Sequence, residues 1–157
     1  MKKKSGFLAL SIIVLLILPV AVSADSPGVI AGYSNRDQQT MGGTNNRCAV
    51  DALSGGHVSW TEGGLSDRIV NYNFIDENGD PAFDDGTQVN PIYGGGFPSV
   101  VVNSQNAAGV AYHNFSNLNV TLGVDGARGI GLFTIYDPPD GMPGISYTFW
   151  PQMAIDY

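Results

Sequence analysis

One block of apolar and polar positions occurs twice in the chain and begins a third time near its end. The segment PSVVVNSQNAAGVAYH at residues 98–113 matches NRCAVDALSGGHVSWT at 46–61 after a shift of 52 positions. Its first half matches PQMAIDY at 151–157 after a shift of 53. A period of this length predicts a repeat protein, in which each unit covers the apolar face of its neighbour.

Each block predicts a strand, a turn and a second strand. Three consecutive apolar residues (CAV, VVV and MAI) indicate a first strand that is buried on both faces. An Asx residue follows, and its short side chain can start a turn by bonding the backbone two residues on. These Asx residues are Asp51, Asn103 and Asp156. The second strand then places Val58 and Trp60 on one face in the first copy, and Val110 and Tyr112 in the second.

Two further strands complete the predicted unit. RIVNYNFID at 68–76 predicts a third strand, which aligns with GIGLFTIYD at 129–137 if the second copy carries extra residues before it. Candidate fourth strands are residues 87–93 and 145–149. Four short antiparallel strands in a unit of roughly 40 to 50 residues are typical of a β-propeller blade. We therefore expect an all-β, incomplete propeller with two blades and the first strand of a third.

The N-terminal residues 1–24 indicate a secretory signal peptide. Three lysines precede an apolar run at residues 7–22, and small residues lie just before Asp25. The alternative is an uncleaved membrane anchor, but the run is shorter than the ~20 residues that a membrane span needs. We expect a secreted, periplasmic or cell-surface protein that has no stable membrane span after cleavage.

The repeat then sets the predicted domain boundaries. Residues 25–45 form a polar leader with a candidate edge strand at 29–33, residues 46–97 form blade 1, residues 98–150 form blade 2, and residues 151–157 form the first strand of a truncated blade 3. Because the chain stops inside a repeat, we expect the N-terminal part of a larger protein. The alternative is that the last strand closes a small domain on its own.

The charge of the chain limits the kinds of partner it can bind, and its cysteine content limits the disulfides it can form. After residue 24 the chain holds no lysine and four arginines against 14 carboxylates, a formal charge of −10. Nucleic-acid binding needs basic side chains, so we expect no nucleic-acid partner. A single cysteine, Cys48, cannot form an internal disulfide.

A segment at residues 76–86 gathers oxygen ligands that could bind Ca²⁺. The weak metal candidates are Asp76, Asn78, Asp80, Asp84 and Asp85. The glycine order of an EF-hand is not matched, because Gly79 precedes the third ligand instead of following it. We favour a solvated acidic turn, and no other cofactor is expected.

The other polar and aromatic candidates are isolated. His57 and His113 lie four repeat positions apart, so the repeat does not pair them as metal ligands. His113 could act in acid/base chemistry, although we favour a structural role. Trp60 and Tyr112 share a repeat position, which suits stacking on a sugar or, as we favour, packing between sheets.

Carboxylates of the second unit could act in glycoside hydrolysis, which needs two groups roughly 5 to 10 Å apart. They are Asp125, Asp137 and Asp140. Nothing in the sequence sets their separations, so no catalytic residue is assigned.

The unit P-x-[VM]-[VA]-[VI]-[ND], followed by a hairpin and HVSW or GVAYH, resembles the secreted bacterial β-propellers of the sialidase-like and BNR-like kind over residues 46–157. Such enzymes carry Asp-boxes, S-x-D-x-G-x-x-W, and the nearest segment here, TLGVDGARGIGLF at 121–133, lacks the serine and the spacing. The arginine cluster that they use on a substrate carboxylate matches no motif here. The arginines concerned are Arg36, Arg47, Arg68 and Arg128.

These observations favour an exported, non-enzymatic propeller that serves as a binding scaffold for a polysaccharide or an extracellular protein. The alternative is a fragment of a sialidase-like glycoside hydrolase or lyase whose catalytic residues lie mostly in missing blades. A third, weaker hypothesis is a surface module stabilised by calcium.

Overall fold

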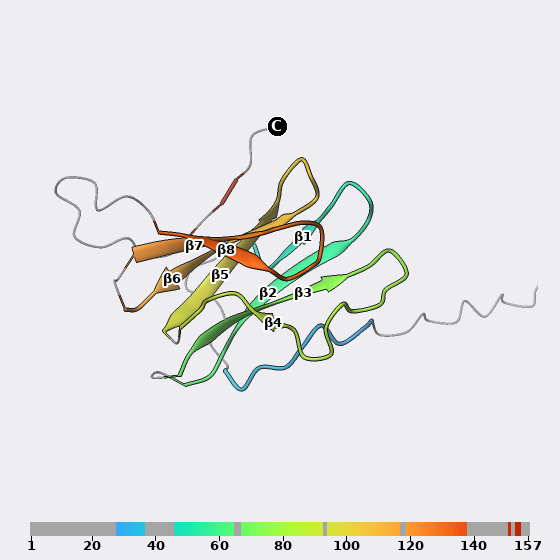
Figure 1. Ribbon diagram of the computed structural model, residues 1–157. Helices are drawn as coiled ribbons and strands as arrows, with labels where there is room; N and C mark the ends of the chain where they lie inside the picture. The colour runs from blue at the N-terminus through green and yellow to red at the C-terminus, as the bar shows by residue number, and fades with distance from the viewer. Residues whose placement is uncertain are drawn as a thin grey trace, which may run out of the picture.

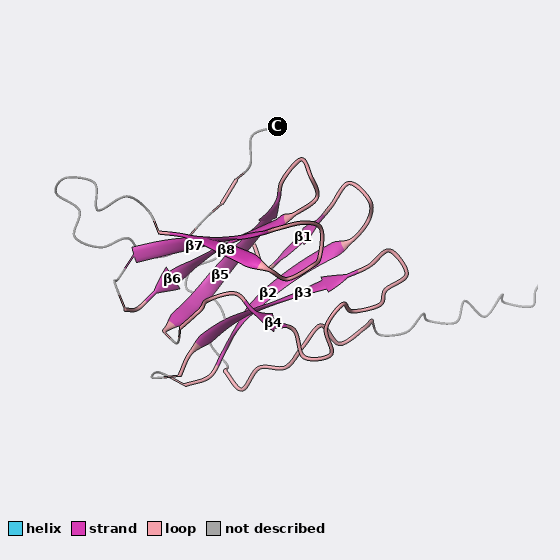
Figure 2. Cartoon of the chain, in the orientation of Figure 1, coloured by secondary structure: helices cyan, strands magenta, loops and turns pink. Residues whose placement is uncertain are grey.

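The chain folds into two antiparallel β-sheets. The computed structural model describes residues 28–36, 46–64, 67–92, 94–116, 119–137, 151 and 153–154. Within these ranges there are eight strands and no helix (Figure 2). The strand orders are β1-β2-β3-β4 and β5-β6-β7-β8. The predicted all-β fold with two four-stranded antiparallel sheets is confirmed.

Successive strands pair as neighbours in both sheets. The first sheet holds β1 (Cys48–Val50), β2 (Gly56–Glu62), β3 (Ile69–Ile75) and β4 (Thr87–Gln88). The second sheet holds β5 (Gly95–Val102), β6 (Ala108–Asn114), β7 (Asn119–Asp125) and β8 (Phe133–Tyr136). The two copies of the sequence repeat thus occupy equivalent places in two sheets, with β1 and β5 each at the start of one.

The β1–β2 and β5–β6 turns share one hydrogen-bond pattern. Asp51 Oδ1 accepts backbone N–H groups two and four residues on, both at 2.8 Å. Asn103 Oδ1 does the same at 2.9 Å. The fourth residue of each turn is left-handed, with φ of 67° at Ser54 and 61° at Asn106. The predicted turn role is confirmed for both Asx residues, whereas Asp156 lies outside the described residues.

The two sheets stack, and their contact surface forms the core (Figure 1). The buried core residues of the first sheet and its β4–β5 loop are Val70, Tyr72, Phe74 and Val89, and those of the second sheet are Val100, Ala108, Val110 and Tyr112. The register pairs Ser59 with Tyr72, so Trp60 lies on the face of β2 that points away from the second sheet. Its repeat counterpart Tyr112 points toward the first sheet. Equivalent faces of the two sheets therefore point the same way.

Residues 28–36 cover the face of the first sheet that is remote from the second sheet (blue in Figure 1). Trp60 Nε1 donates to the Tyr33 carbonyl at 2.8 Å, and Asn73 Nδ2 donates to the Ala31 carbonyl at 2.6 Å. A Cβ on Gly32 would lie 2.1 Å from the Trp60 ring, so only glycine allows this approach. The predicted edge strand at 29–33 is wrong, because the segment binds through side chains of β2 and β3.

Met153 lies against the second sheet on the face that is remote from the first. A Cβ added to Gly109 would lie 3.2 Å from Met153 Cε, 3.4 Å from Val101 Cγ2 and 3.8 Å from Leu122 Cδ1. The start of the third repeat copy thus packs on the second sheet on the side opposite to the one that the first sheet covers.

The third strand of the second copy differs from the prediction. The structure places β7 at Asn119–Asp125 in that position, and only the Phe133–Tyr136 part of the predicted range 129–137 is a strand, β8, which is the fourth strand. The β6–β7 connection is short, so a strand directly after it pairs at once with β6. The alternation in NVTLGVD was the overlooked signal. The other candidate fourth strand, 145–149, lies outside the described ranges.

The first strand of the first copy is not covered on both faces as predicted. Val50 is 74% exposed and Cys48 is also exposed, whereas every residue of β5 is buried. Residues 28–36 bond with β2 and β3 but leave β1 open. The equivalent strand β5 lies on the first sheet and is covered on its other side as well.

The predicted signal peptide at 1–24 lies outside the described residues. No helix long and apolar enough to cross a membrane occurs in the described part of the chain.

Candidate functional site

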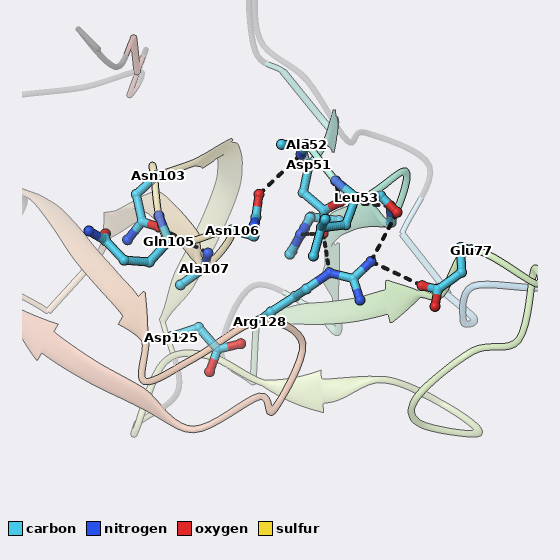
Figure 3. Close-up of polar contacts among 12 residues, drawn as sticks. Asp51, Ala52, Leu53, Glu77, Asn103, Gln105, Asn106, Ala107, Asp125 and Arg128 are labelled. Carbon is cyan, nitrogen blue, oxygen red and sulfur yellow. Dashed lines mark hydrogen bonds and ion pairs between the residues drawn. The ribbon is translucent and has the colours of Figure 1, made fainter.

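Asp51 is the centre of a buried polar network between the sheets (Figure 3). Its side chain has no exposed surface. While Oδ1 caps the β1–β2 turn, Oδ2 lies 2.5 Å from Arg128 Nε and 3.3 Å from His57 Nε2. One carboxylate thus holds together a turn, a strand of its own sheet and an arginine of the other sheet.

Arg128 reaches this carboxylate from the β7–β8 loop of the second sheet. Its Nη2 donates to Glu77 Oε2 at 3.1 Å (Figure 3). Its guanidinium lies 4.7 Å from the centre of the Phe74 ring. Gly129 follows with φ of 67°, and a Cβ there would lie 2.4 Å from Phe74. This close approach of the loop allows the arginine to cross between the sheets.

His57 links Asp51 to Tyr72. Its Nδ1 lies 2.7 Å from the Tyr72 hydroxyl. A carboxylate can only accept hydrogen bonds, so Nε2 carries the proton that faces Asp51, and Nδ1 accepts the hydroxyl proton of Tyr72. The histidine is therefore the neutral Nε2–H tautomer.

Burial and hydrogen bonds set the protonation states of this network. Burial alone would raise the pKa of Asp51, but the hydrogen bonds from Arg128 and the turn outweigh it and hold that pKa well below its usual range. Burial lowers the pKa of His57, and Asp51 only partly offsets this. Burial raises the pKa of Tyr72 far above its usual value, so its hydroxyl stays protonated at neutral pH.

The network suits a structural role better than a catalytic one. His57 and Tyr72 have no exposed surface, so a substrate cannot reach the one group that resembles a general base. The hydroxyl proton of Tyr72 is already donated to His57, and both oxygens of Asp51 accept bonds within the protein. The arrangement fixes how the two sheets stack.

The network predicts that acid lowers the free energy of unfolding in two steps. A histidine with a depressed folded pKa binds its proton more readily when unfolded, so stability falls as pH drops below about 6.5. A carboxylate with a depressed pKa stabilises the fold above about 3.9, and this contribution is lost as pH falls further. Urea titrations between pH 8 and pH 3 measure both steps.

A control variant separates His57 from His113, whose pKa is also lowered, first by burial and then by Arg68. His113→Phe should keep part of the decrease between pH 7 and pH 5. A stability that stays constant over this range in both proteins would contradict the prediction.

The acidic segment forms a third turn of the Asx kind. Asp76 Oδ1 accepts the N–H groups of Asn78 at 2.9 Å and of Asp80 at 2.8 Å, and Gly79 has a φ of 90°. The hydrogen bond from the Asp80 backbone lowers the pKa of Asp76 against a smaller effect of burial. No group of three or more His, Cys, Asp or Glu side chains in the described ranges is placed to hold a metal ion. The structure thus does not gather the calcium candidates, which also include Asp84 and Asp85.

The histidines and the paired aromatic residues are buried. His113 is 1% exposed, so it does not line a surface. It lies near the end of β6, whereas His57 lies near the start of β2. Tyr112 belongs to the core between the sheets, which confirms packing for this residue. Trp60 is 8% exposed and packs under residues 28–36 instead of between the sheets.

The candidate carboxylates of the second sheet have local partners. Asp125 accepts the N–H groups of Gly131 at 3.1 Å and Leu132 at 3.0 Å, which closes the β7–β8 loop. Asp137 Oδ1 accepts from the Thr121 hydroxyl at 2.9 Å. Asp140 lies outside the described residues.

Sequence reasoning identified Asp51 as a turn residue but missed its network. No spacing along the chain connects Asp51 to Arg128, 77 positions later. Comparison of the chain with described protein families, with curated proteins and with solved structures finds no match.

Proposed function

We propose that the two sheets are successive blades of a β-propeller and that the protein is an exported binding scaffold. Each sheet is a four-stranded meander, the form that a propeller repeats around its central axis. A groove of about 430 Å³ lies between β1, β5 and residues 153–154, so the starts of all three repeat copies converge. In a propeller the first strands of the blades line the axis in this way.

The observation that carries the proposal is the position of Met153. The second sheet packs one face on the first sheet, and Met153 begins to cover its other face. Two sheets that packed the same face against each other would leave no equivalent face for a third unit. Here equivalent faces point the same way, so each unit still offers a face on which the next unit can pack. Heterologous stacking of this kind gives a ring when the rotation between successive units closes, which is the arrangement proposed here.

The binding role is supported by what the polar groups do. The most connected polar network is buried and holds the sheets together, while the loops at the ends of the strands remain available for contacts. Binding residues are commonly carried on such loops by a rigid scaffold. The N-terminal sequence resembles a signal peptide, which supports the proposal of an exported scaffold with polysaccharides or extracellular proteins as partners.

A panel of purified polysaccharides tests the binding role. Isothermal titration calorimetry should detect saturable binding to at least one of them, and prolonged incubation should release neither reducing ends nor unsaturated products. Release of either product would establish the hydrolase or lyase alternative. Absence of heat with every polysaccharide would overturn the polysaccharide as the ligand class.

A further inference from the structure

Arg68 is a buried cation in an unusual environment. It directly precedes β3 in the first sheet and is 3% exposed. Its guanidinium lies 4.4 Å from the centre of the Phe115 ring and 5.3 Å from that of Phe97. Its Nε and Nη1 are buried, and neither has a hydrogen-bond acceptor among the described residues. The side chain is therefore held by aromatic rings, with two donors unused.

A second arginine, Arg36, lies close enough to Arg68 to lower its pKa. Arg36 lies 5.7 Å from the centre of the same Phe97 ring, and the His113 ring lies 4.0 Å from that of Phe115. Burial and then Arg36 lower the pKa of Arg68, and burial and then Arg68 lower the pKa of His113. No carboxylate of the described part contributes to either shift.

A buried charge without a partner destabilises a protein, and contacts with aromatic rings recover only part of the lost hydration. The backbone of β5 nevertheless leaves space for the Arg68 side chain. A Cβ on Gly96, at the irregularity in β5, would lie 2.7 Å from Arg68 Cδ and 3.3 Å from Nη1. The backbone thus accommodates the guanidinium at this position with two of its donors unused.

We propose that Arg68, with Arg36 beside it, binds a sulfate or phosphate group. In a positive potential a divalent oxyanion gains about twice the Coulomb energy of a carboxylate at the same distance. Arg36 also lines a cavity of about 350 Å³ with Ser34, Arg47 and Trp60, which offers space for the rest of a ligand. This site lies beyond the proposed scaffold role and does not depend on the number of blades.

Calorimetry with sodium sulfate tests the site, with ionic strength held constant by sodium chloride. The wild-type protein should bind one sulfate, and sodium acetate should bind on the order of tenfold more weakly. Arg68→Gln should lose the binding. Thr134→Glu is the matched control, because it changes the net charge by the same amount at an exposed position of β8 and should bind sulfate as wild type does.

Two outcomes would overturn the site: equal binding of acetate and sulfate, or equal loss of binding in both variants. If Arg68→Gln does not fold, the Nε–H resonance of Arg68 in the wild-type protein decides. That resonance should shift with sulfate while the Arg128 resonance stays in place, and a stationary Arg68 signal would refute the proposal. A sulfated polysaccharide that binds more tightly than free sulfate, with its desulfated form inactive, identifies an ester as the ligand.

Discussion

Asp51→Ala is expected to lower the free energy of unfolding by about 3 kcal/mol, the lower end of the cost of breaking a buried ion pair, because Arg128 is partly exposed and keeps its pair with Glu77. The change leaves Arg128 facing a cavity and leaves the Nε2–H of His57 without an acceptor. It also removes the cap of the β1–β2 turn. Urea unfolding followed by tryptophan fluorescence measures the loss.

The repeat supplies the control for this prediction. Asn103 caps the equivalent turn with the same two backbone bonds but forms none of the ionic contacts of Asp51. Asn103→Ala should therefore cost about 1 kcal/mol, the value of ordinary hydrogen bonds. If the two alanine variants lost equal stability, the network between the sheets would contribute nothing beyond the turn.

Tyr112→Ala is the second large effect, with an expected loss of about 3–5 kcal/mol, as for other large aromatic residues removed from a core. Tyr112 is 1% exposed and lies among the residues that join the two sheets. A ring enclosed in this way cannot stack on a sugar, so the affinity of the folded variant for any bound polysaccharide should not change. Thermal and urea unfolding, together with calorimetry, measure the two properties.

Tyr136→Ala is the matched control because this tyrosine is 55% exposed on β8. Its loss of stability should stay within about 0.5 kcal/mol, as for most surface substitutions. A Tyr112→Ala protein with near wild-type stability and weakened polysaccharide binding would instead restore the interpretation as a sugar-stacking shelf.

The turns were the most predictable part of the fold. The bonds of Asp51 and Asn103 join groups two to four residues apart, so they follow from the residue type and its immediate neighbours. The same logic extends to Asp76, whose acidic segment forms a turn as predicted. Short-range hydrogen bonding decides these turns before any packing occurs.

The third strand of the second sheet and the burial of β1 were less predictable. Residues 119–125 and 129–137 both alternate, and only the pairing with β6 shows which of them comes third. Val50 and Val102 have the same local sequence context, yet one is 74% exposed and the other 6%. Their difference depends on what covers each strand, which no local pattern states.

The amino-acid sequence alone determined the repeat, the β class and the turns that join the first two strands of each unit. Periodicity and Asx hydrogen bonding act over a few residues, so they can be read directly from the chain. Only the tertiary structure decided which face of each sheet is covered, and which distant residues meet across the stack. Arg128 and Arg68 illustrate this, because the electrostatic environment of each arises from strands brought together by stacking and not from its neighbours in sequence.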